Sequence, residues 1–156
     1  LVWGGVPVGG DIATLLDDDA RMQAQAAEKG SIIMLLATDA PLDARQLKRL
    51  ALHAAAGLAR TGSVYGHGSG DIALAFSTAY TLPHLAETPM PQVAMVHETL
   101  MDGLFVAAAD AVEQAIVHAL WHAEPVQGRN GHSRPCIREL LSRLRAPAVP
   151  SPDSRS

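Results

Sequence analysis

The dipeptide Gly30-Ser31 carries the chemistry that the sequence suggests most directly. A glycine stands immediately before a serine that opens the apolar stretch IIMLLAT, residues 32–38. Because glycine lacks a Cβ, its carbonyl tolerates a strained backbone and close approach by the next hydroxyl, which suits an N-to-O acyl shift. If hydrolysis follows, Ser31 gains a free α-amine with an ordinary pKa of about 7.7–8.0, a base on the nucleophile's own residue. The alternative is a Gly-Ser turn before a strand.

A second group of polar residues lies in Gly68-Ser69-Gly70-Asp71. Ser69 stands between glycines and can approach another backbone closely, and Asp71, two residues on in an extended segment, points to the same side. A hydroxyl backed by a carboxylate can hold or relay a proton for a nearby nucleophile. The alternative is a glycine-rich turn in which Asp71 bonds its own backbone. A dinucleotide-binding loop is excluded, because these glycines lead into a strand and not a helix.

Strands and helices must position these residues. Residues 32–38 are apolar on both faces, which predicts a central strand covered on both sides. Asp43 and Gln46 form a capping-box pattern before apolar residues at helical spacing, which predicts an amphipathic helix up to about residue 60. Residues 72–77 alternate bulky and small side chains and predict a second strand. A long helix is expected from about residue 97 to residue 123.

The two ends of the chain are less regular. Residues 1–8 predict a short strand, and residues 11–30 a polar linker with weak helical character. Glycines at 128 and 131 end the long helix, and a shorter basic helix is expected around residues 137–144. The sequence begins at Leu1 without an initiator Met or a signal-peptide pattern, so we expect a fragment whose N-terminal part is missing.

Composition narrows the class of protein. The 156 residues are 48% hydrophobic and 18% charged, as in one globular domain or part of one. A net charge of −4 and an aromatic content of 4% argue against a nucleic-acid partner. No uninterrupted apolar run approaches the roughly 18 residues of a membrane span, so no membrane partner is expected. The single cysteine, Cys136, excludes an intrachain disulfide.

Other polar residues have simpler explanations. His118 and His122 stand at the i and i+4 spacing that can chelate zinc, but no third ligand is near in sequence. The acidic run at residues 17–19 is interpreted as a solvated turn, so no metal site is expected. The loop residues Tyr65, His67 and His84 could line a pocket, although nothing in the sequence distinguishes this from an ordinary surface position.

Three blocks of sequence together resemble a known family. Gly30-Ser31 with IIMLLATDAPLDARQLKRLA, then GLARTGS, then GSGDIALAFST are similar in order and spacing to the L-aminopeptidase/D-esterase (DmpA-like) family, which includes the β-peptidyl aminopeptidases. GVPVG near residues 5–9 and AIVHALWHAEPVQGRNGH extend the resemblance. It fades beyond about Ser133.

The resemblance implies a precursor that cleaves itself between Gly30 and Ser31. Residues 1–30 would be the C-terminal tail of an α-subunit with its linker, residues 31–145 the β-subunit, and residues 146–156 a disordered tail. The implied fold is α/β (α+β), a fragment of the αββα sandwich shared by DmpA and the ornithine acetyltransferases. The resemblance also implies an enzyme that needs no metal and no organic cofactor.

The resemblance also implies roles and partners. Ser31 would attack the substrate carbonyl to form an acyl-enzyme, and Ser69 with Asp71 would orient and relay protons around its amine. The substrate would be a small peptide, amide or ester that loses its N-terminal residue. The partners would be the chain's own upstream α-subunit segment and further αβ units in a homo-oligomer. The localisation is unknown from the sequence, and both a cytoplasmic and a periplasmic location stay open.

The family's oxyanion-hole Asn and its amine-binding acid lie upstream, so these 156 residues alone are expected to be poorly active. Losing one oxyanion donor costs on the order of 10²–10³ in kcat. Apolar faces left uncovered should mark an interface.

Two alternatives stay open. One is an ornithine-acetyltransferase-like acyltransferase, because that fold also carries an ATDA-like strand after its cleavage point. Those enzymes use Thr as nucleophile, whereas this chain has Ser31 and a GSGD block. The other is an inactive truncated relative that serves as a structural piece.

Overall fold

The structure is a computed structural model of the chain, and it describes residues 1–20, 30–85, 89 and 92–145. The predictions made for the linker at 21–29 and for the tail at 146–156 lie outside the described residues, as do the side chains of the acidic run at 17–19. The elements are β1 (Val2–Trp3), β2 (Val6–Pro7), α1 (Gly9–Ala20), β3 (Ile33–Thr38), α2 (Ala44–Arg60), β4 (Ile72–Ser77), α3 (Met101–His122), β5 (Val126–Gln127), β6 (Ser133–Arg134) and α4 (Ile137–Arg145).

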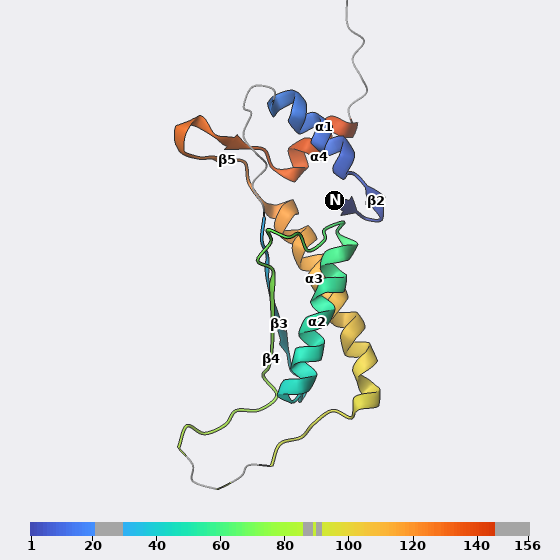
Figure 1. The fold of residues 1–156 in the computed structure, drawn as a ribbon, viewed down its shortest axis with the longest axis vertical. Coiled ribbons are helices and arrows are strands. Elements are labelled where there is room, and N and C mark those ends of the chain that lie inside the picture. Colours follow the sequence, from blue (N-terminus) through green and yellow to red (C-terminus); the bar gives the residue numbers. More distant parts are fainter. Residues whose placement is uncertain (21–29, 86–88, 90–91, 146–156) are drawn as a thin grey trace, which may run out of the picture.

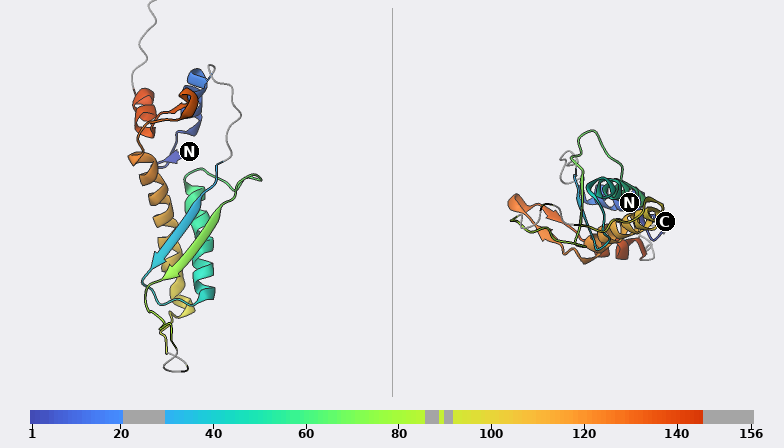
Figure 2. Two further views of the ribbon diagram at one scale, coloured as in Figure 1. Left: turned by 90° about the vertical axis from the view of Figure 1, so that its left-hand side faces the viewer. Right: turned by 90° about the horizontal axis from the view of Figure 1, so that it is seen from below.

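The strands β3 and β4 are parallel neighbours, and α2 is the crossover between them. Their register pairs Ile33 with Ile72 and Thr38 with Ser77. Figure 1 and Figure 2 show α2 and α3 together on one face of this pair. This arrangement confirms the two predicted strands and both predicted helices. Because parallel strands begin at the same edge, the segments just before β3 and β4 lie side by side.

The core lies between the β3–β4 pair and the two helices. Met34 and Leu36 of β3 are buried against Leu50 and Ala54 of α2 and against Met101 of α3. The predicted capping box starts α2: the Gln46 N–H donates to Asp43 Oδ1 at 2.6 Å, and the Asp43 N–H donates to Gln46 Oε1 at 3.2 Å. This reciprocal pair satisfies backbone donors that the first turn would leave without partners.

The prediction that β3 is covered on both sides is wrong for the described residues. Ile33 and Leu35 are 76% and 63% exposed, because both helices pack on the opposite face. In β4 the bulky side chains of Ile72, Leu74 and Phe76 are also exposed, whereas the alanines between them face α2. Small side chains let the helix approach the strands closely. The bulky residues therefore form an apolar sheet face that the described part of the chain leaves open.

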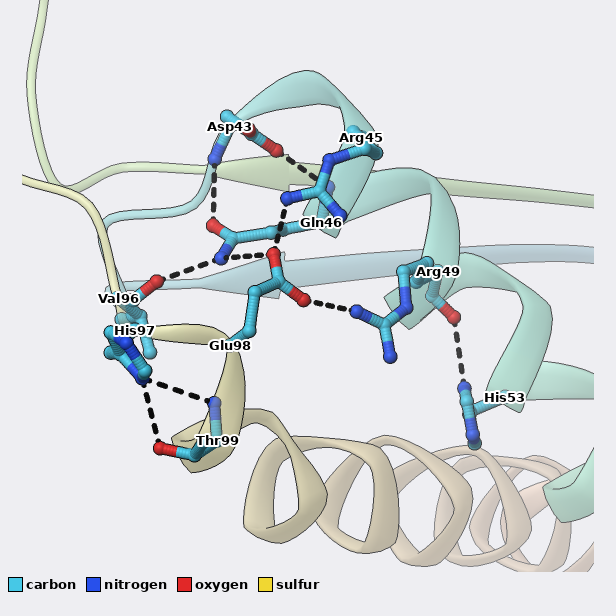
Figure 3. Close-up of polar contacts among 9 residues, drawn as sticks. All are labelled: Asp43, Arg45, Gln46, Arg49, His53, Val96, His97, Glu98 and Thr99. Carbon is cyan, nitrogen blue, oxygen red and sulfur yellow. Dashed lines mark hydrogen bonds and ion pairs between the residues drawn. The ribbon is translucent and has the colours of Figure 1, made fainter.

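Glu98 fixes the segment that returns from β4 to α3. It begins the 3₁₀ turn Glu98–Leu100 and forms ion pairs with Arg45 and Arg49 of α2. Buried Gln46 donates to Val96 O at 2.7 Å and to Glu98 Oε1 at 3.1 Å (Figure 3). The hydrogen bond from Arg45 holds the pKa of Glu98 below its ordinary value, and Gln46 and the charge of Arg49 act in the same direction.

Both ends of the chain contain short hairpins that the periodicity did not predict. The prediction of one short strand over residues 1–8 is wrong, because these residues form the antiparallel pair β1–β2. Its turn uses Gly4 and Gly5 at φ of 55° and 80°. Helix α1 begins directly afterwards, where a weakly helical linker was expected. The pair β5–β6 encloses Asn130 and Gly131, also at positive φ. The expected basic helix is present as α4.

By length and composition alone, the stretch Glu98–His122 could cross a membrane. Core helices of globular proteins meet the same criteria, so this property is a weak indication of a membrane span. One side of α3 is buried against α2 through Met101, Phe105 and Val112.

Candidate active site

The starts of β3 and β4 bring the two predicted polar groups together. The Ile72 N–H donates to Ile32 O at 2.9 Å, which extends the parallel ladder one step beyond the paired residues. Residues 30–32 therefore lie against residues 69–71, although 39 positions separate them in sequence. The parallel register thus places Gly30, Ser31, Ser69 and Asp71 in one site.

Ser31 lies at the centre of this site. Its side chain is exposed, and its Oγ accepts a hydrogen bond from the Gly70 N–H at 3.0 Å. A Cβ on residue 70 would lie 3.6 Å from the same oxygen, in ordinary contact. The backbone donor fixes one lone pair of the hydroxyl, and the exposed side chain leaves the oxygen accessible.

Ser69 contacts the bond that was predicted to break. Its Oγ donates to the carbonyl oxygen of Gly30 at 3.2 Å, and its own N–H donates to Gly66 O at 3.0 Å in a tight turn. A donor on this carbonyl withdraws electron density from its carbon, which favours attack by a hydroxyl. Ser69 therefore contacts the Gly30 carbonyl directly, and its predicted role in orienting and relaying protons around the Ser31 amine stays a prediction.

Asp71 bonds across the strands and not within its own turn. Its Oδ1 accepts a hydrogen bond from the Ile32 N–H at 3.1 Å. This interaction differs from the alternative considered from the sequence, in which Asp71 bonds the backbone of its own glycine-rich turn. Asp71 is half-buried. The carboxylate is therefore bound to the backbone nitrogen of Ile32, the residue that directly follows Ser31.

An open pocket of about 700 Å³ adjoins the three residues. Ser31, Ser69 and Asp71 line it together with apolar side chains from α2, α3 and the N-terminus: Leu1, Leu58, Ile116 and Leu120. His67 also lines it, whereas Tyr65 and His84 are not among its lining residues. The sequence could have indicated His67 as a pocket residue, because His67 lies between Gly66 and Gly68, and Gly68 directly precedes Ser69. Among the described lining residues, His67 and Asp71 carry the titratable side chains.

The other candidate ligands do not form a metal site within the described part of the chain. No group of three His, Cys, Asp or Glu side chains that could hold a metal occurs there. His122 Nδ1 bonds His118 O at 3.0 Å, an interaction along one helix. Cys136 is buried at 5% exposure beside α4.

Comparison with known proteins identifies the family. The sequence matches Peptidase family S58 over residues 1–134. It is 39% identical over 137 residues to beta-peptidyl aminopeptidase BapA of Sphingosinicella microcystinivorans, an alignment that covers 83% of this chain and 35% of that protein. The chain therefore belongs to peptidase family S58, and the predicted DmpA-like membership is confirmed. It spans about a third of the length of this curated relative.

Solved structures support the same fold. The chain matches l-aminopeptidase d-ala-esterase/amidase from Ochrobactrum anthropi with a TM-score of 0.71 and 37% identity, over 92% of this chain and 39% of that one. That structure is described as a prototype for the serine aminopeptidases and a variant of the Ntn hydrolase fold. A Burkholderia sp. beta-aminopeptidase matches with a TM-score of 0.66 and 40% identity, over 80% of this chain and 37% of that one. The predicted fold class is confirmed, and the acyltransferase alternative is not favoured.

Proposed function

We propose that this chain contains the cleavage point and the nucleophile of a self-processing serine aminopeptidase. Residues 1–30 would end an α-subunit, residues 31–145 would form the β-subunit, and residues 146–156 would be its tail. Membership of a peptidase family supports the reaction class. The observation that carries the proposal is the Ser69 hydroxyl on the Gly30 carbonyl, next to Ser31 Oγ.

Self-cleavage would begin with attack of Ser31 Oγ on the Gly30 carbonyl carbon. The Ser69 hydroxyl would donate to the oxyanion. The C–N bond would break, and the proton lost by Ser31 Oγ would pass to the nitrogen as it becomes an amine. The product is an ester between Gly30 and the Ser31 side chain. Water would then hydrolyse this ester, leaving a carboxylate on Gly30 and both a free amine and a hydroxyl on Ser31.

In turnover, the new amine would accept the proton of Ser31 Oγ as the oxygen attacks the substrate carbonyl. The proton would pass to the leaving amine or alcohol, and water would release the acyl group. Ser69 and Asp71 would orient and relay protons around the amine. Asp71 supports this role because its carboxylate is fixed on the Ile32 N–H, one residue from the amine nitrogen.

The proposed substrates are small peptides, amides or esters with a free N-terminal residue, including β- or D-residues. This proposal follows from relatives described as beta-peptidyl aminopeptidase and as l-aminopeptidase d-ala-esterase/amidase. An oxyanion-hole Asn and an amine-binding acid would come from upstream sequence. The proposed assembly is a homo-oligomer of αβ units.

The test uses the complete protein and an aminoacyl p-nitroanilide. Ser31→Ala is expected to remove turnover entirely. Ser63→Ala, at another serine that lines the same pocket, should leave turnover near the unmodified rate. Continued hydrolysis by the Ser31→Ala protein would show that another residue is the nucleophile.

A further inference from the structure

His67 is a pocket residue that the proposed mechanism does not use. It lies in the loop between α2 and β4, and Figure 2 shows this loop at the end of the strand pair where β3 and β4 begin. The Ser69 N–H donates to Gly66 O at 3.0 Å, so residues 66–69 form a tight turn with His67 as its second residue. A Cβ added at Gly66 would meet no described atom within 4 Å apart from its chain neighbours. The turn therefore borders open space, and His67 is exposed where it lines the pocket.

The imidazole of His67 is available to a ligand. Within the part of the chain that the structure describes, no hydrogen bond or ion pair holds it. The Asp71 carboxylate, in contrast, accepts from the Ile32 N–H, and the Ser69 hydroxyl donates to Gly30 O. Neutral imidazole has one N–H donor and imidazolium has two, so this side chain can donate a hydrogen bond in either protonation state.

The side chains around the pocket favour an anionic group at His67. No Lys or Arg occurs among the described lining residues, and the Asp71 carboxylate repels a second negative charge. Much of the remaining wall is apolar, with Leu58 of α2 and Ile116 of α3 among the lining residues. An anion that leaves water for such a wall is unfavourable unless a hydrogen-bond donor receives it. His67 supplies that donor, and a charge-assisted bond forms when the imidazole is protonated.

The length of the turn indicates which substrate group can reach His67. Its Cα lies two residues before that of Ser69, which places the two atoms at most about 7.6 Å apart. The Ser69 hydroxyl lies beside Ser31, where the proposed mechanism places the attacked carbonyl. In a dipeptide, the C-terminal carboxylate follows this carbonyl after one residue, about 3.3–3.6 Å of extended chain. Each further residue would carry the carboxylate away by the same length.

We propose that His67 is a specificity-determining residue that donates a hydrogen bond to the C-terminal carboxylate of a dipeptide substrate. This inference rests on the proposed function and adds to it the part of the substrate that follows the cleaved bond. A dipeptide that ends in a carboxylate is then bound better than the same dipeptide that ends in an amide, because the amide removes the anion that His67 receives.

The test is the ratio of kcat/KM for L-alanyl-L-leucine to kcat/KM for L-alanyl-L-leucinamide, measured on the complete protein by the release of alanine. The unmodified protein should prefer the dipeptide on the order of tenfold or more, and His67→Ala should bring the ratio near one. His67→Gln, whose side-chain amide still donates, should retain part of the preference. His84→Ala is the matched control, at a loop histidine outside the described lining, and should leave the ratio unchanged.

Two outcomes of this experiment would overturn the proposal. One is a ratio near one in the unmodified protein, and the other is an unchanged ratio in His67→Ala, including an equal fall on both compounds. If the complete protein hydrolyses neither compound, isothermal titration calorimetry measures the binding of both. Tighter binding of the dipeptide that is lost in His67→Ala would then support the role of His67 while the proposed function fails. Equal binding of the two compounds would contradict the role of His67 as well.

Discussion

The hydroxyl of Ser69 donates a hydrogen bond to the carbonyl oxygen of Gly30 at 3.2 Å. The parallel register of β3 and β4 produces this contact, because it sets residues 69–71 against residues 30–32. The proposed self-cleavage turns this carbonyl oxygen into an oxyanion. The donor is therefore in place before the reaction begins and needs no rearrangement.

Ser69→Ala should slow self-cleavage on the order of 10²–10³-fold, because the oxyanion loses one hydrogen-bond donor. The measurement is the rate at which the piece beginning at Ser31 appears by mass spectrometry. Ser63→Ala is the control, since Ser63 also lines the pocket. Equal rates for Ser69→Ala and the unmodified protein would remove Ser69 from the mechanism.

Substitutions of Asp71 should separate its structural role from its electrostatic role. Asp71→Asn keeps an oxygen that can accept from the Ile32 N–H, whereas Asp71→Ala leaves that donor without its partner, a loss of about 1–3 kcal/mol where the donor is buried. We expect Asn to preserve the free energy of unfolding better than Ala, while both reduce aminopeptidase turnover. Full turnover in Asp71→Asn would mean that the negative charge has no role in proton transfer.

Local sequence signals predicted the elements that carry the site. Asp43 and Gln46 predicted the start of α2 because a capping box depends on residues only three positions apart. The strands at 72–77 and near 32–38 followed from apolar patterning. The pairing of Gly30-Ser31 with Ser69 and Asp71 came from the family resemblance. No local pattern specifies which strands are neighbours or in what register.

The packing of α2 against α3 depends on Gly57. A Cβ at this position would lie 2.4 Å from the Ala109 carbonyl oxygen and 2.8 Å from Val112 Cβ, so the helices would have to move apart. Gly57→Ala should therefore lower the free energy of unfolding by about 1–3 kcal/mol in urea titrations.

Gly103→Ala is the matched control for Gly57. Gly103 lies in α3, and an added Cβ there would meet nothing within 4 Å beyond its chain neighbours and the nearby backbone of its own helix. The substitution should therefore be stabilising by about 0.5–1 kcal/mol through helix propensity. Equal stability of the two variants would contradict the close approach of the helices at Gly57.

Glu98 should make part of the stability depend on pH. Its pKa is lowered in the folded protein, first by the hydrogen bond from Arg45, so folding favours the ionised form. The stabilisation is then present above the unfolded pKa of about 4.3 and is lost as the pH falls through the lower, folded value. The difference in Tm between the unmodified protein and Glu98→Gln should shrink in this acidic range.

Asp102→Asn, at an acidic residue in the first turn of α3, is the control for the pH dependence of the Tm difference between the unmodified protein and Glu98→Gln. A Tm difference for Glu98→Gln that stays constant from neutral pH to pH values well below about 4 would contradict the role of the ionised carboxylate.

The sequence did not predict features that depend on which other segments cover a strand or on very short strands. The apolar pattern of residues 32–38 predicted cover on both faces, but Ile33 and Leu35 are exposed because α2 and α3 share one side. Apolarity indicates that a face favours burial and does not say which residues bury it. The β1–β2 hairpin was missed because its strands are two residues long, too short for a periodicity to show.

The intact mass of the freshly purified complete protein tests the central claim most directly. We expect two species separated by a break between Gly30 and Ser31, with Ser31 as the first residue of the second piece. The Ser31→Ala protein should give one uncut species. A single uncut species from the unmodified protein, active or not, would contradict the proposal that Ser31 acquires a free amine.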